Sequence, residues 1–192
     1  MRPDIVITGS EKFLDIGIVN ELFKSNIPCI GPLKKLADIE LSKTFARNFL
    51  QFNNLGKYNP KYEVINSFNE CKLEELFCSF SYDFVIKDDG LCGGKGVKVE
   101  GIDFERKEEL LLEIVKSEKG ERILIEEKIE GEEYSLMTIS DGNGGVDHFP
   151  PIQDNKRLNE NDKGPNTGGM GCIIDKENIL PFLNEYDVKL SE

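Results

Sequence analysis

Two lysines flank a glycine-rich segment near the middle of the chain, which reads Val85-Ile86-Lys87-Asp88-Asp89-Gly90-Leu91-Cys92-Gly93-Gly94-Lys95-Gly96-Val97. Glycines let backbone N–H groups approach phosphate oxygens, and lysine ammonium groups neutralise phosphate charge. The segment is not a Walker A loop, because Lys95 is followed by Gly96 and not by Ser or Thr. The pattern indicates either a phosphate-binding hairpin or an ordinary glycine-rich hairpin with a surface lysine.

An acidic stretch separates two predicted strands further along the chain. Glu126-Glu127 end the apolar run that begins at Ile123, and Glu132-Glu133 open the next predicted strand. Backbone groups of such a hinge could bind the edge of an adenine ring, while an acidic side chain binds ribose hydroxyls. A solvated acidic turn is the competing interpretation.

A third polar segment combines basic residues with glycines. It reads Gln153-Asp154-Asn155-Lys156-Arg157, followed by Gly164-Pro165-Asn166-Thr167-Gly168-Gly169-Met170-Gly171. Basic side chains beside a glycine-rich loop could hold a phosphate or a carboxylate, and this composition is not typical of a flexible linker. The single histidine, His148, is interpreted as a surface residue without a chemical role.

Alternating strands and helices must position these three segments. The hydrophobic pattern predicts strand 4–9, helix 14–25, strand and turn 27–32, helix 33–52, loop 53–60, strand 62–67, helix 69–79, strand 82–87, strand 97–99, helix 103–117, strand 122–128, strand 134–140 and turn 141–145. Residues 152–171 show little periodicity, and no strand is predicted there. The first three elements form a βαβ unit, and because two parallel strands are not stable alone, we expect this unit to end a larger α/β domain.

Composition narrows the class of protein. The 192 residues suffice for one medium domain or two small ones, and a 39% hydrophobic content excludes disorder. A net charge of −12 argues against nucleic-acid and membrane-surface partners. The five cysteines are odd in number and form no C-x-x-C pair, which favours reduced thiols over a zinc site. With no long apolar run and no signal-peptide layout at the N-terminus, we expect a cytoplasmic protein.

Taken in order, these motifs resemble those of phosphoribosylamine–glycine ligases of the ATP-grasp type. The resemblance covers nearly the whole chain and rests on Pro3-Asp4, Gly31-Pro32, Ser42-Lys43, Ile86-Lys87, Gly94-Lys95-Gly96-Val97, Glu126-Glu127, Gly131-Glu132-Glu133, Gln153-Asp154-x-Lys156-Arg157 and Gly164–Gly171. The last segment is the most specific, since other ATP-grasp carboxylate–amine ligases share the lysines and the hinge but differ there.

The resemblance implies an α/β (α+β) ATP-grasp core preceded by the last βαβ unit of an N-terminal α/β domain. On this pattern, residues 1–32 are a remnant of the substrate domain and residues 33–60 a helix and linker. Residues 61–130 form the small lid subdomain, and residues 131–192 begin an incomplete large subdomain. The implied reaction activates glycine with ATP as glycyl phosphate. The amine of 5-phosphoribosylamine then attacks it, giving glycinamide ribonucleotide, ADP and phosphate for purine biosynthesis.

The same resemblance implies roles for individual residues. The implied ATP ligands are Lys43 and Lys87 for the phosphates, a lid of Gly93, Gly94, Lys95 and Gly96, an adenine hinge of Glu126, Glu127 and Ile129, and Glu133, with Glu132 second, for the ribose. Asp154, Lys156 and Arg157 are expected to face glycine and phosphoribosylamine, and no residue acts as a nucleophile. Three residues depart from the family pattern, with Asn155 replacing the usual His, and Asp88 and Gly93 each replacing the usual Ala.

Some family features are expected outside this sequence. The ligands for Mg²⁺ (or Mn²⁺) are expected beyond Glu192, and a substrate phosphate loop before Met1, so the resemblance implies little or no turnover by this chain alone. One alternative is a subunit of a split enzyme that a complementary fragment completes. Another is a non-catalytic nucleotide-binding remnant, which the joint presence of Lys43, Lys87, Lys95 and Glu133 disfavours.

Overall fold

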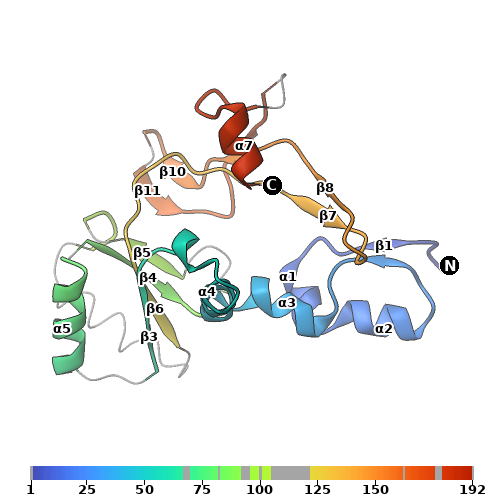
Figure 1. The fold of residues 1–192 in the computed structure, drawn as a ribbon, viewed down its shortest axis with the longest axis horizontal. Coiled ribbons are helices and arrows are strands. Elements are labelled where there is room, and N and C mark those ends of the chain that lie inside the picture. Colours follow the sequence, from blue (N-terminus) through green and yellow to red (C-terminus); the bar gives the residue numbers. More distant parts are fainter. Residues whose placement is uncertain are drawn as a thin grey trace. The chain divides into compact units, whose positions relative to one another are not determined.

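The structure is a computed structural model that describes residues 2–66, 70–81, 83–91, 96–99, 101–104, 122–161, 163–175 and 179–191. These residues fall into two compact units, Met1–Lys128 and Ile129–Glu192. Figure 1 shows their elements in chain order. The first unit contains β1 (Val6–Ile7), α1 (Glu11–Asp15), α2 (Ile18–Lys24), β2 (Cys29–Ile30), α3 (Lys34–Leu41), α4 (Lys43–Phe52), the 3₁₀ helix η1 (Gly56–Tyr58), β3 (Tyr62–Ile65), α5 (Glu70–Ser79), β4 (Phe84–Asp88), β5 (Val97–Val99) and β6 (Ile123–Glu127).

The predicted βαβ unit is confirmed, although its helix is broken. Strands β1 and β2 are parallel and pair Val6 with Cys29 and Ile7 with Ile30. The single helix predicted over residues 14–25 is wrong, because Gly17 has a φ of +78° between α1 and α2. Glycine adopts this left-handed conformation without the steric cost of a Cβ atom.

The helix predicted over residues 33–52 is also two helices, separated at Ser42. Ser42 has an extended backbone, and its hydroxyl accepts a hydrogen bond from the backbone N–H of Phe45 at 3.0 Å. Serine is a favoured N-cap because its side chain satisfies an N–H group that the helix leaves unpaired. The cap therefore starts a new helix, α4, whose first residue is Lys43.

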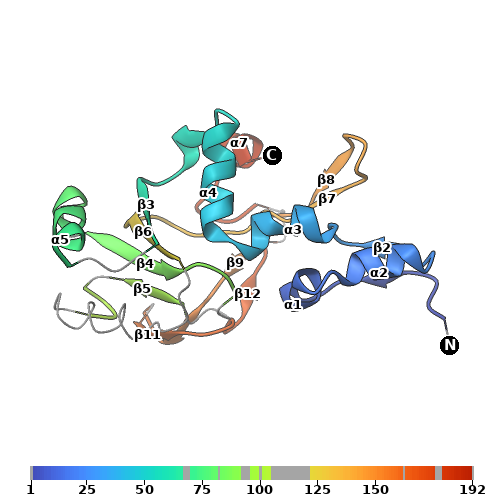
Figure 2. The same cartoon turned by 90° about the horizontal axis from the view of Figure 1, so that it is seen from below.

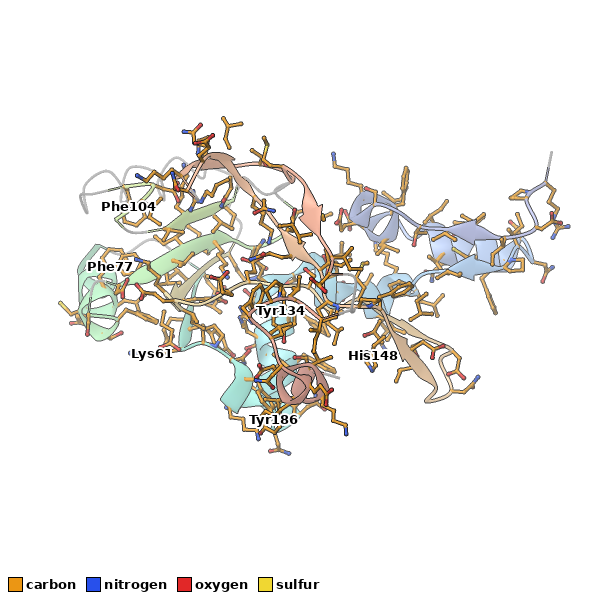
Figure 3. All side chains as sticks on the ribbon, turned by 90° about the horizontal axis from the view of Figure 1, so that it is seen from above. Lys61, Phe77, Phe104, Tyr134, His148 and Tyr186 are labelled. Carbon is orange, nitrogen blue, oxygen red and sulfur yellow. The ribbon has the colours of Figure 1, made fainter. Side chains whose placement is uncertain are left out.

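The largest sheet of the first unit is antiparallel, with strand order β3-β6-β4-β5. Helix α5 lies on one side of this sheet and α4 on the other (Figures 1 and 2). The α5 side forms an apolar core, in which the ring of Phe84 stacks on Phe77 with centroids 4.7 Å apart and packs near Phe104 (Figure 3). Because side chains alternate along a strand, Lys87 lies on the opposite face from Phe84 and Ile86.

Two parts of the sequence-based prediction fall mainly or wholly outside the described residues. These are the helix expected over residues 103–117, of which only Asp103 and Phe104 are described, and the lid residues Gly93, Gly94 and Lys95. The neighbouring strands are described and antiparallel, with Lys87 opposite Val97.

The second unit consists of short strands and one described helix. Its elements are β7 (Thr138–Ser140), β8 (Val146–His148), β9 (Gln153–Asp154), β10 (Arg157–Asn159), β11 (Lys163–Asn166), β12 (Cys172–Ile173) and α7 (Glu185–Ser191). The tyrosine hydroxyl of Tyr134 hydrogen-bonds Ser191 of α7 (Figure 3).

Strand β7 is shorter than the predicted strand over residues 134–140. It forms a hairpin with β8, joined by the expected turn, in which Asp141 accepts hydrogen bonds from the N–H groups of Asn143 and Gly145. Beyond the hairpin, Ser135 pairs with Ile152 in an isolated bridge. Pro150 and Pro151 lie between the hairpin and this bridge. Because proline has no N–H group to donate, the hydrogen-bond ladder is not continuous there.

The structure has strands in residues 152–171, where the sequence pattern predicted none. Strand β9 pairs with β12, and β10 pairs with β11 with Arg157 opposite Asn166. These strands are only two to four residues long, so their sequences are too short to show the apolar alternation by which strands are normally predicted. No helix in the described part of the chain is both long and apolar enough to cross a membrane.

Candidate functional site

A buried carboxylate with two cationic partners lies on the α4 face of the main sheet. Glu126, on β6, is only 2% exposed. Arg47 of α4 donates from Nε to Oε1 at 2.5 Å and from its terminal guanidinium nitrogen to Oε2 at 3.2 Å. Lys87 of β4 donates to the same Oε2. Two cations and one carboxylate leave this cluster with one net positive charge.

The environment lowers the pKa of Glu126 below its ordinary value of 4.5. Burial is the largest single influence and raises the pKa, because it disfavours the charged form. The hydrogen bonds and charges of Arg47 and Lys87 act in the opposite direction and together outweigh it. Glu126 is therefore a carboxylate at neutral pH.

This pKa shift predicts a pH dependence of stability. Since the folded protein holds the pKa of Glu126 below the value in the unfolded chain, the stabilisation is complete above about pH 4.5 and is lost as the pH falls through the lower, folded-state pKa. We expect the free energy of unfolding to fall less steeply with acidification in Glu126→Gln than in the wild-type chain. Urea unfolding followed by circular dichroism, from roughly pH 6 to roughly pH 3, measures the difference.

Glu63→Gln is the matched control for this experiment, because Glu63 is exposed on the neighbouring strand β3. It should keep the wild-type pH dependence. Equal slopes for the wild-type chain and Glu126→Gln would contradict the prediction.

A second cluster joins the start of α4 to the end of β4. The ammonium of Lys43 donates to the carbonyl oxygens of Asp88 and Gly90, both at 2.9 Å. Asp89 is only 6% exposed. Its carboxylate accepts hydrogen bonds from the Ser42 hydroxyl at 3.1 Å and from the Thr44 N–H at 3.2 Å. These contacts place Lys43 at the point where the glycine-rich turn leaves β4.

Loss of the Asp89 carboxylate should destabilise the first unit. Asp89→Ala removes the acceptor for a helix N-terminal N–H group and leaves the Ser42 hydroxyl without that partner, so we expect a loss of about 2 kcal/mol in the free energy of unfolding. Urea unfolding measures the loss. Circular dichroism is the probe, because the chain contains no Trp whose fluorescence could report unfolding. Asp88→Asn is the matched control and should change stability by less than about 0.5 kcal/mol. A loss no larger in Asp89→Ala than in the control would refute the assignment.

The structure thus brings together two of the predicted phosphate ligands, Lys43 and Lys87, at the end of β4. Gly96, the described member of the predicted lid, is buried, and its carbonyl accepts from the Asp88 N–H at 2.8 Å. Glu127 instead caps the entry to β3, where its carboxylate accepts from the Lys61 N–H at 2.8 Å. The Glu127 backbone N–H also donates, to the Lys61 carbonyl at 2.9 Å.

Two residues of this site, Arg47 and Asp89, were not among the residues singled out from the sequence. A signal for Arg47 exists, because it follows Lys43 by one helical turn and so lies on the same face of α4. Asp89 carries no comparable signal, since its partners Ser42 and Thr44 are distant in the sequence.

In the second unit, the predicted ribose ligands contact the predicted substrate-facing segment. Glu133 forms an ion pair with Lys156, and Glu132 accepts from the Gln153 amide at 3.1 Å. Ile129 is 68% exposed. His148, expected at the surface, is half-buried, and its Nδ1 hydrogen-bonds the Thr138 hydroxyl across the β7–β8 hairpin (Figure 3).

The glycine-rich segment Gly164–Gly171 folds onto residues 154–157. Arg157 donates to the Gly164 carbonyl at 2.8 Å, and the Thr167 hydroxyl donates to the Lys156 carbonyl at 2.9 Å. Gly169 has a φ of +128°, and a Cβ atom there would lie 3.3 Å from a carboxylate oxygen of Asp154. A side chain at Gly169 would therefore be strained and crowd Asp154.

These arrangements suit recognition of an anionic ligand better than metal coordination. The first unit holds the two lysines where the glycine-rich segment follows β4, and lysine cations bind phosphate. Within the described segments, no group of three or more His, Cys, Asp or Glu side chains is placed to hold a metal ion.

Known proteins provide an independent comparison. Residues 41–190 match the family described as phosphoribosylglycinamide synthetase, ATP-grasp (A) domain. A phosphoribosylamine–glycine ligase of Methanocella arvoryzae is 41% identical over 186 residues, which cover 96% of this chain and 41% of that protein. A bifunctional purine biosynthetic protein of Schizosaccharomyces pombe is 41% identical over 185 residues, covering 95% of this chain and 23% of that one.

A comparison with solved structures also matches a phosphoribosylamine–glycine ligase. The crystal structure of a phosphoribosylamine–glycine ligase from Thermotoga maritima matches with a TM-score of 0.69 and 35% identity, covering 90% of this chain and 41% of that one. D-alanyl-alanine synthetase A of Vibrio cholerae has the same TM-score at 13% identity, covering 98% of this chain and 56% of that one, and shows likeness of fold alone. The chain spans about two fifths of the length of the phosphoribosylamine–glycine ligases it matches. With the family match extending over most of its residues, the chain belongs to the phosphoribosylglycinamide synthetase family and has the ATP-grasp fold.

Proposed function

We propose that this chain binds ATP and supplies the nucleotide-binding part of a reaction that ligates glycine to 5-phosphoribosylamine. The observation that carries the proposal is the gathering of Lys43 and Lys87 at the end of β4, where the glycine-rich turn begins. The substrates are those named by the activity of its relatives, the phosphoribosylamine–glycine ligases. ATP is abundant in the cytoplasm, so the proposal includes a cytoplasmic location.

The proposed reaction needs charge neutralisation and protection from water. Lys43 and Lys87 would bind phosphate oxygens of ATP, and the turn containing Gly93, Gly94, Lys95 and Gly96 would cover them. Fixed cations stabilise charge that shifts during phosphoryl transfer, and exclusion of water protects an acyl phosphate from hydrolysis. A bound Mg²⁺ would add neutralising charge to the triphosphate.

We further propose roles for residues at the end of the first unit and in the second unit. Glu133, with Glu132 second, would bind the ribose hydroxyls, and the backbone around Glu126, Glu127 and Ile129 would bind adenine. Asp154, Lys156 and Arg157 would face glycine and phosphoribosylamine. The Glu133–Lys156 ion pair supports this assignment, since it brings a predicted nucleotide ligand beside a predicted substrate ligand. The domain roles expected from the resemblance, with boundaries after residues 32, 60 and 130, stay predictions.

Phosphate release tests the reaction. The purified chain would be incubated with MgATP, glycine and 5-phosphoribosylamine, with each component omitted in turn. Release that requires both glycine and phosphoribosylamine would support ligation by this chain. Saturable ATP binding without release would restrict the chain to the nucleotide-binding role. A folded chain that neither binds ATP nor releases phosphate would refute the proposal.

An apolar surface on the N-terminal part of the first unit favours association with more polypeptide of the same family. Ile5, Ile7 and Ile30, on or beside the parallel β1–β2 pair, are all exposed, although parallel sheets are normally covered on both faces. We propose that further α/β structure, in a longer chain or a complementary fragment, covers this surface. Size-exclusion chromatography with the unmatched segments of the Methanocella arvoryzae ligase should show co-elution, which Ile7→Asp abolishes and Ile139→Asp does not. Elution of the folded chain alone would contradict it.

A further inference from the structure

Arg47 and the proposed phosphate ligand Lys87 both pair with the carboxylate of Glu126. Its guanidinium contacts both oxygens of Glu126, whereas Lys87 contacts one of them. About a quarter of each cationic side chain is exposed, but the Glu126 side chain is almost fully buried. The arginine therefore shares the charge of Glu126 with the lysine.

We infer that Arg47 is a positioning residue that keeps the Lys87 ammonium available to a nucleotide phosphate by neutralising Glu126. This inference rests on the proposed function, in which Lys87 binds ATP. It assigns Arg47 an effect on nucleotide affinity without requiring contact between Arg47 and the nucleotide.

Charge balance supports the inference. With Arg47 present, the three side chains carry one net positive charge, and Glu126 keeps a two-point partner when Lys87 turns toward a phosphate. Without Arg47, Glu126 and Lys87 would neutralise each other. Lys87 could then reach a phosphate only by leaving a buried carboxylate unpaired, which is strongly unfavourable.

The backbone around Arg47 is anchored, as a positioning residue requires. The side-chain amide of Asn59 donates to the Arg47 carbonyl at 2.9 Å. The adjacent Asn48 side chain accepts from the hydroxyl of Tyr62, on β3, at 2.9 Å. The contact with Tyr62 thus fixes α4 to the sheet at the residue next to the arginine, and the same helix begins with Lys43. A purely structural role, in which Arg47 only stabilises this packing, is the alternative.

Four proteins distinguish these roles: the wild-type chain, Arg47→Met, Glu126→Gln and the double variant Arg47→Met/Glu126→Gln. Their net cluster charges are +1, 0, +2 and +1, from the one carboxylate and two cations of the cluster. Calorimetric titration with MgADP should show affinity about tenfold weaker in Arg47→Met. Glu126→Gln keeps the backbone groups proposed to bind adenine and removes only the side-chain charge, so it should bind at least as tightly as the wild-type chain. The double variant should recover affinity to within about threefold of the wild-type value.

Recovery in the double variant is the decisive result, because a structural role predicts the opposite. If Arg47 only stabilised the fold, removing a second member of the cluster would leave binding as weak as in Arg47→Met or weaker. Arg47→Lys, which keeps the charge, should retain most of the affinity. Urea unfolding of every variant ensures that folded proteins are compared.

A second readout separates failure of this inference from failure of the proposed function. Acetic anhydride labelling followed by mass spectrometry reports the reactivity of the Lys87 amine without any nucleotide. Arg47→Met should label more slowly at Lys87, and the double variant should return to at least the wild-type rate. If no protein binds nucleotide, the proposed function fails, whereas the labelling still decides the effect of Arg47 on Lys87. Unchanged labelling in Arg47→Met, or no recovery of binding in the double variant, would overturn the inference.

Discussion

Lys87→Met should lower the affinity of the chain for MgATP by about 100-fold. A hydrogen bond between a lysine and a charged acceptor contributes about 1.5–3 kcal/mol, which corresponds to about a 10- to 150-fold change in affinity. We expect a value in the upper part of this range, because the variant also removes one of the two cations that neutralise Glu126. The carboxylate of Glu126 would then repel the negatively charged triphosphate more strongly. Displacement of a fluorescent ATP analogue measures the change.

Lys57→Met is the control, since Lys57 lies in η1 with its ammonium over the ring of the adjacent Tyr58, outside the two clusters. Its affinity should equal that of the wild-type chain. Lys87→Met should remain folded, because Arg47 still pairs with Glu126. An affinity unchanged within about threefold, a difference of about 0.7 kcal/mol, would remove Lys87 from the site.

Phe84→Ala should lower the free energy of unfolding of the first unit by about 4 kcal/mol. The side chain is buried, stacks on Phe77 and packs near Phe104, so its removal leaves a cavity in the centre of the core. Small domains are stable by only about 5–15 kcal/mol, so the variant is expected to approach unfolding. Urea unfolding at neutral pH measures the loss.

Phe84→Leu is the conservative comparison and should lose about 1.5 kcal/mol or less, because most of the buried volume is kept. Phe13→Ala serves as the surface control, since Phe13 is 53% exposed and belongs to α1. A loss in Phe84→Ala no greater than in Phe13→Ala would show that the core lies elsewhere.

Local sequence signals predicted most of the first unit. The pattern of apolar residues indicated the order of strands and helices from residue 4 to residue 99, and the structure confirms that order. The errors occur where one residue changes the backbone. Gly17 and Ser42 each divide a predicted helix in two, and the hydrophobic pattern passes through both positions without interruption.

The second unit was less predictable, because its strands depend on pairing. Strands β9 to β12 are only two to four residues long, and none of them contains a run of β-branched or aromatic residues, so neither periodicity nor propensity marks them. The motifs in this unit were nevertheless visible as motifs. The structure adds that Gly164–Gly171 folds onto residues 154–157, which explains why a glycine-rich segment stands beside two basic residues.

The candidate site itself was predicted in part. Lys43 and Lys87 were singled out from the sequence, and the structure brings them to the end of the same strand. The spacing of Arg47 from Lys43 indicated only a shared helix face, and Asp89 had no signal. The partners of both lie far along the chain, Glu126 for Arg47 and Ser42 and Thr44 for Asp89. Such partners are known only once the sheet register is known.

Calorimetric titration of the folded chain with ATP and Mg²⁺ tests the central claim most directly. We predict saturable binding with one ATP per chain, weakened by Lys87→Met and kept in Lys57→Met. Circular dichroism on the same sample establishes that the chain is folded. A folded chain that gives no saturable heat with ATP would contradict the assignment of Lys43 and Lys87 as phosphate ligands.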